Sequence, residues 1–87
     1  MRLSKQLIVE NEMGLHARPA SLLVKIANRY KATIEICKDG ETVSAKSIMG
    51  VLTLAAEKGA VLDVIIDGPD AKEAMTEIEA FLKRPNG

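Results

Sequence analysis

The sequence contains one histidine, His16, and it is followed closely by Arg18 and Pro19 in the run HARP. A neutral imidazole has one unprotonated ring nitrogen, which can attack phosphorus as a nucleophile. A guanidinium is planar and permanently charged, and its N–H groups suit the oxygens of a phosphate. These residue types at this spacing indicate a site that holds a phosphoryl group beside the imidazole.

A helix is expected to begin at these residues. From Ala17 to Tyr30 apolar residues recur at intervals of three and four, as in a helix that covers a sheet. The first N–H groups of a helix lack partners within it, and the helix dipole adds partial positive charge there. That charge favours a neutral His16 and a bound anion, and Pro19 fits the first turn because its missing N–H breaks no helical bond. The helix start at Ala17 and Pro19, together with Arg18, is therefore predicted to support the phosphate.

A purely structural role for these residues also fits their spacing, with His16 as an exposed capping residue and Arg18 as a solvated charge. No carboxylate pair or second base lies near His16 in the sequence, and the glycine-rich loops that bind nucleotide phosphates are absent. If His16 is functional, this favours one exposed nucleophile on a small carrier over a pocket that turns over small substrates.

Composition excludes several classes of protein. The 87 residues are 47% hydrophobic and carry no net charge, which suits one compact domain over residues 1–87. Tyr30 and Phe81 are the only aromatic residues, so the basic, aromatic surface of a nucleic-acid-binding protein is missing. With one cysteine, Cys37, and one histidine, we expect no disulfide, no metal site and no cofactor. No stretch is long enough for a signal peptide core or a membrane span, which predicts a cytoplasmic protein without membrane insertion.

The periodicity of apolar residues and the turn residues predict four strands and three helices in the order βαββαβα. Strands are expected at residues 5–10, 32–38, 42–45 and 60–67, and helices at 17–30, at 47–59 and from 71 to a stop at RPNG, residues 84–87. Asp39 and Gly40 form the turn of an antiparallel hairpin. Polar residues Gln6, Glu35, Asp63 and Asp67 lie opposite in parity to the apolar ones, so one sheet face is polar. The fold class is α+β, an open-faced sandwich in which three helices cover one face of a four-stranded antiparallel sheet.

The middle helix offers a second candidate site. Ser47 is a good N-cap residue for it. Ile48, Met49, Val51 and Leu52 supply more apolar side chains than one face of a short helix can bury. We expect Met49, with Ile48 or Val51, to form an apolar docking patch for partners, the alternative being that all of them are core residues.

Two runs resemble a known family, the HPr phosphocarrier proteins of the bacterial phosphoenolpyruvate-dependent phosphotransferase system. They are GLHARPA, residues 14–20, and KSIMGVLTLAAEKGA, residues 46–60, and the resemblance extends over essentially the whole chain. It implies the open-faced βαββαβα fold and a carrier, not an enzyme. It further implies that His16 accepts a phosphoryl group on Nδ1 from the phosphohistidine of enzyme I, with help from Arg18.

The resemblance also implies the partners. His16 would pass the phosphoryl group to an enzyme II component such as enzyme IIA, and Ser47 would be the regulatory serine that HPr kinase/phosphorylase modifies. A phosphate on Ser47 would repel an acidic partner surface without disturbing the helix. A transcriptional regulator is a further expected partner, and we expect a monomer.

Several alternatives remain at this point. The run KSIMGV favours a carrier for sugar uptake, whereas LTLAAEKG is also similar to the nitrogen-type regulatory paralogues. The presence of His16 excludes the catabolite-regulator homologues that lack the histidine. A module that binds a regulator through the Ser47 helix, with His16 silent, and a hydrolase that uses His16 are the two other classes of function.

Overall fold

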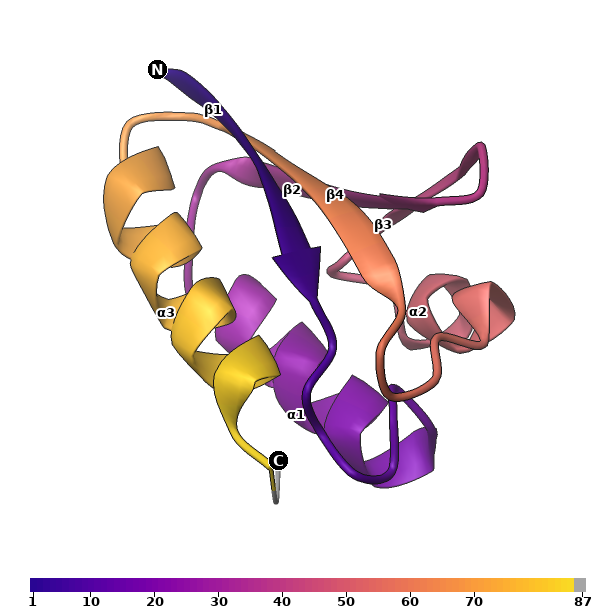
Figure 1. The fold of residues 1–87 in the computed structure, drawn as a ribbon. Coiled ribbons are helices and arrows are strands. Elements are labelled where there is room, and N and C mark those ends of the chain that lie inside the picture. The colour runs from indigo at the N-terminus through magenta and orange to yellow at the C-terminus, as the bar shows by residue number, and fades with distance from the viewer. Residues whose placement is uncertain (86–87) are drawn as a thin grey trace.

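The computed structural model describes residues 1–85 and contains four strands and three helices (Figure 1). In chain order they are β1 (Arg2–Ile8), α1 (Ala17–Ala27), β2 (Thr33–Lys38), β3 (Glu41–Ser44), α2 (Ile48–Leu54), β4 (Val61–Asp67) and α3 (Ala71–Lys83). This is the predicted βαββαβα order. Within residues 1–85, no helix has the length and apolar character needed to cross a membrane.

The strands form one sheet in the order β1-β4-β2-β3, and every neighbouring pair is antiparallel. Alternate residues of β2 and β4 are buried against the helices, whereas Glu35, Asp63 and Asp67 face outward and are exposed. The three helices cover the other face (Figure 1), and the expected open-faced sandwich is confirmed. The largest fully buried side chains are Val9, Leu15, Leu23, Ile34, Ile36, Val51, Leu62, Val64, Ile66, Ile78, Phe81 and Leu82.

The first helix is shorter than predicted, because α1 ends at Ala27 and not at Tyr30. Asn28 caps it, and its side-chain amide donates to the carbonyl oxygen of Val24 at 2.9 Å. The N–H groups of Arg29 and Tyr30 bond three residues back, which tightens the chain into a turn. Tyr30 therefore lies in the turn that leads to β2.

The middle helix also ends earlier than expected, at Leu54 and not near Gly59. Ala55 adopts a left-handed conformation with φ 49° and ends α2, and Ala56 is fully buried. Residues 55–60 therefore form a loop that returns toward the start of α1.

The first strand departs from its predicted bounds of 5–10, because β1 spans Arg2–Ile8. β1 begins at Arg2 because it pairs with the whole of β4, from Arg2 opposite Asp67 to Ile8 opposite Val61. At the other end α3 stops at Lys83, directly before RPNG, as predicted. Of that run, Asn86 and Gly87 lie outside the described residues.

Candidate functional site

The N-terminus of α1, called the helix mouth below, has backbone N–H groups without acceptors among the residues that the structure describes. His16 is the N-cap residue in extended conformation, as predicted, and its side chain makes no capping hydrogen bond. Its carbonyl oxygen accepts the N–H of Ala20 at 2.8 Å. Within residues 1–85, no group accepts a hydrogen bond from the N–H of Ala17 or Arg18, and Pro19 has no N–H. An anion at this point would meet two free donors and the positive end of the helix dipole.

The segment before α1 packs closely on the loop after α2. The N–H of Leu15 donates to the carbonyl oxygen of Ala56 at 2.7 Å. Gly14 has φ +66°, and a Cβ there would lie 2.5 Å from the same oxygen and 3.0 Å from Cα of Glu57. Glycine is therefore required at position 14 both by the backbone conformation and by the close approach of the loop.

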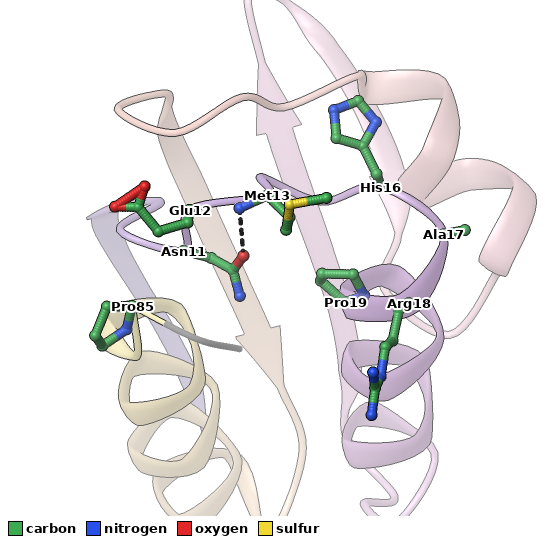
Figure 2. A pocket seen from close by; sticks show the side chains of 8 residues that line it. All are labelled: Asn11, Glu12, Met13, His16, Ala17, Arg18, Pro19 and Pro85. Atoms are coloured by element: carbon green, nitrogen blue, oxygen red, sulfur yellow. Dashed lines mark hydrogen bonds between the residues drawn. The ribbon is translucent and has the colours of Figure 1, made fainter.

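The side chains at the helix mouth line a hollow of about 520 Å³, which Figure 2 shows. Its lining residues are Asn11, Glu12, Met13, His16, Ala17, Arg18, Pro19 and Pro85. The His16 side chain is 52% exposed. The Arg18 side chain extends along α1, away from the His16 ring (Figure 2). The structure thus brings the predicted residues to one hollow, but it does not bring the guanidinium to the imidazole.

The carboxylate of Glu57 lies close to the imidazole ring of His16. Oε1 of Glu57, in the loop after α2, lies 3.3 Å from Nε2 of His16, although 41 positions separate the two residues. The sequence predicts no second base near His16, and Glu57 is not among the predicted site residues. Local spacing carries no signal for this contact, because it depends on the return of the loop after α2.

Two further residues of the hollow were also missed. Asn11 is 2% exposed, and its side-chain oxygen accepts the N–H of Met13 at 2.9 Å, which fixes the turn before α1. Glu12 forms an ion pair with Lys58 at 2.6 Å, which ties this turn to the loop after α2. An asparagine close to Gly14 is a general turn signal, but the sequence predicted only a loop in NEMG.

The second candidate site lies at the start of α2, where some of the predicted residues are exposed and one is buried. Ser47 is the N-cap residue, as predicted, and its Oγ accepts the N–H of Gly50 at 3.0 Å. Met49 and Ile48 are 73% and 45% exposed. Val51 is completely buried, so its predicted place in an exposed docking patch is wrong; it lies on the face of α2 that packs into the core.

Within residues 1–85, no three His, Cys, Asp or Glu side chains are grouped to hold a metal ion. The site offers an exposed imidazole and, at the start of α1, backbone N–H groups without acceptors in the described part of the chain. Together they can hold an anionic group at a ring nitrogen.

Comparison with known proteins identifies the family of the chain. The family model PTS-HPr, described as the PTS HPr component phosphorylation site, matches residues 3–84. The HPr-like protein Crh of Halalkalibacterium halodurans is 46% identical over 92% of this chain and 95% of its own length. The phosphocarrier protein HPr of Treponema pallidum is 44% identical over 91% of this chain and 90% of its own.

A solved structure shows the same fold. The phosphocarrier protein HPr of Bacillus anthracis superposes with a TM-score of 0.91 and 44% identity, covering 93% of this chain and 96% of that one. The family match and the fold place the chain in a class of small phosphocarrier proteins of the phosphotransferase system. The chain belongs to the HPr family, as its sequence resemblance implied.

Proposed function

We propose that His16 accepts a phosphoryl group from the phosphohistidine of enzyme I and passes it to an enzyme II component such as enzyme IIA. The observation that carries this proposal is the half-exposed imidazole at the N-cap of an 11-residue helix, beside two unpartnered N–H groups. The protein acts in the cytoplasm as a monomer, once per phosphoryl group, without a cofactor and without turnover of its own.

The transfer step uses groups that the hollow supplies. The lone pair of His16 Nδ1 forms a bond to phosphorus while the bond to the donor nitrogen breaks, and that electron pair returns to the donor ring. The phosphoryl oxygens then face the N–H groups of Ala17 and Arg18. Charge near a helix N-terminus is worth about 0.3–1 kcal/mol, and up to ~2 kcal/mol when partly buried. The exposed Arg18 side chain adds charged donors when it turns toward the helix mouth.

Intact-mass measurement after incubation with phosphoenolpyruvate and a cognate enzyme I tests this function. The wild-type protein is expected to gain one phosphate that is labile in acid and stable in alkali, and His16→Ala is expected to gain none. An unmodified wild type would overturn the proposal and leave binding through the Ser47 helix as the better account. Release of many equivalents of free phosphate without a second protein would instead indicate a hydrolase.

Ser47 is the proposed regulatory site of the same carrier. The residue is exposed, caps α2, and is followed by the exposed Ile48 and Met49. A phosphate added by HPr kinase/phosphorylase would bring about two negative charges to the edge of this patch, which repels an acidic partner and can create a site for a transcriptional regulator. With that kinase and ATP, wild type is expected to gain an acid-stable phosphate and then accept phosphate on His16 more slowly. Ser47→Ala should show neither change, and an equal uptake rate in modified wild type would contradict the proposal.

A further inference from the structure

The contact between His16 and Glu57 carries an inference about how the ring is oriented. An ionised carboxylate has only acceptor oxygens, so this contact favours the tautomer of His16 in which Nε2 carries the proton and donates to Oε1 of Glu57. A neutral imidazole with its proton on Nε2 has a free lone pair on Nδ1. Within residues 1–85, no group hydrogen-bonds Nδ1 of His16.

The backbone of the loop at Glu57 is held against the segment that precedes His16. The close packing of Gly14 on Ala56 and on Cα of Glu57 holds the loop against the residues that precede His16. The N–H of Gly59 donates to the carbonyl oxygen of Val9 at 2.7 Å on the far side of the same loop. The adjacent cation, Lys58, is paired with Glu12, and the Glu57 carboxylate faces the imidazole.

We propose that Glu57 is a positioning residue for His16, whose carboxylate holds the proton on Nε2 and so presents Nδ1 as the phosphoryl acceptor. This inference rests on the proposed function, and it adds a residue that acts through the histidine. Carboxylates that accept the second N–H of a reactive or metal-bound histidine fix its tautomer and ring orientation in the same way.

The same contact balances charge during transfer. When the Nδ1 lone pair bonds to phosphorus, the ring keeps its Nε2 proton and becomes formally cationic, while the departing electron pair returns to the donor ring. The Glu57 carboxylate then faces an N–H of a positively charged ring, and such charge-assisted hydrogen bonds are shorter and stronger than neutral ones. Glu57 therefore favours the phosphorylated ring over the free one.

The first test reads the tautomer in the unphosphorylated protein. His16 is the only histidine, so the ¹⁵N signals of labelled imidazole belong to this ring alone. At a pH where the ring is neutral, wild type is expected to show the proton on Nε2 almost exclusively. Glu57→Ala should move both signals toward the tautomer mixture of free imidazole. Glu57→Gln, whose amide oxygen still accepts from Nε2–H, should restore most of the wild-type pattern.

The second test measures the rate of phosphoryl uptake from enzyme I. Glu57→Ala is expected to slow uptake about two- to fivefold, the range for the loss of an exposed ion pair. Glu10→Gln is the matched control, since Glu10 is exposed and its removal changes the net charge equally without touching His16. Unfolding midpoints should be the same for all variants, because the Glu57 side chain is 71% exposed.

The outcomes separate this inference from the proposed function. An unchanged tautomer in Glu57→Ala overturns the positioning role, and so does a changed tautomer with an unchanged uptake rate. An equal slowing in Glu10→Gln would assign the effect to net charge and also overturn it. A wild type that takes up no phosphate refutes the carrier function, and the tautomer measurement still decides whether Glu57 orients the ring.

Discussion

His16 and Arg18 belong to one turn of the chain, but their side chains diverge. The guanidinium extends along α1 while the imidazole stands at the helix mouth (Figure 2). Holding a long arginine side chain in one rotamer costs up to about 2 kcal/mol of entropy. A charged group bound to the ring can offset this cost through charge-assisted hydrogen bonds. We therefore expect Arg18 to act on the phosphorylated protein more than on the free one.

Arg18→Ala is expected to slow phosphoryl uptake and to shorten the lifetime of the phosphohistidine. A hydrogen bond to a charged group is worth about 1.5–3 kcal/mol, which corresponds to roughly 10- to 150-fold in rate. Arg18→Lys keeps the charge but loses the planar pair of donors, so its rate should lie in between. The measurement is stopped-flow or quench kinetics with phosphorylated enzyme I. Equal rates for wild type and Arg18→Ala would show that the backbone donors alone hold the phosphate.

The segment before α1 packs closely on the loop after α2, and Gly14 permits this close approach. Gly14→Ala is expected to lower the free energy of unfolding by at least about 1–2 kcal/mol, the cost of a left-handed L-residue. It must also displace the Ala56 carbonyl, because the new Cβ would lie 2.5 Å from its oxygen. Urea denaturation measures the change.

The matched control for Gly14 is Gly40→Ala. Gly40 also has a positive φ, +84°, but a Cβ added there would meet no atom within 4 Å, so the substitution brings the strain without the clash. Gly14→Ala should therefore lose more stability than Gly40→Ala. Equal losses would show that the packing of the two loops contributes nothing measurable.

Asp70 links the start of α3 to the turn before β2. Its carboxylate accepts the N–H of Lys31 at 2.8 Å and of Ala32 at 2.9 Å. The hydrogen bond from Lys31 is the largest cause that lowers the pKa of Asp70 below its usual value. Because the folded pKa lies below the unfolded one, ionised Asp70 stabilises the fold above its ordinary pKa, and this is lost as pH falls through the lowered value.

Asp70→Asn is therefore expected to lower the unfolding temperature at neutral pH and to change it little in strong acid, where the wild-type carboxyl is also protonated. Thermal unfolding followed by circular dichroism at both pH values provides the measurement. Asp63→Asn removes the same charge from the open face of the sheet and should have a smaller effect at neutral pH. A destabilisation of Asp70→Asn that is the same at both pH values would refute the link to ionisation.

Local patterns predicted the elements well where local chemistry decides them. The strand parity of Glu35 and Asp63 and the caps at His16 and Ser47 follow from residue type and spacing alone. The end of α2 does not, because Ala55 has no intrinsic preference for a left-handed conformation, and tertiary packing of the buried Ala56 sets it. Glu57 was missed for the same reason.

The open-faced arrangement decides which apolar side chains of α2 are available to partners. The helix packs against α1 and β3, and this buries Val51. Met49 and Ile48 are left on the outer surface of an element that neighbours the histidine helix. Sequence periodicity could not decide whether Val51 lies on the surface or in the core. A seven-residue helix has few turns, and the face that it buries depends on how the helix is placed against its two neighbouring elements.

The contrast between Met49 and Val51 tests the division between docking surface and core. Met49→Ala is expected to slow transfer to or from the partner proteins while the free energy of unfolding stays within about 0.5 kcal/mol, as is usual for surface substitutions. Val51→Ala removes fully buried methyl groups and should cost about 2 kcal/mol. Because it leaves the outer surface intact, its transfer rate per folded molecule should match wild type.

Ile8→Ala is the control, since Ile8 is an exposed apolar residue, 51% accessible, on the opposite, open face of the sheet. If Ile8→Ala slows transfer as much as Met49→Ala, partners do not dock specifically at α2, and the exposed residues of that helix serve no distinct surface.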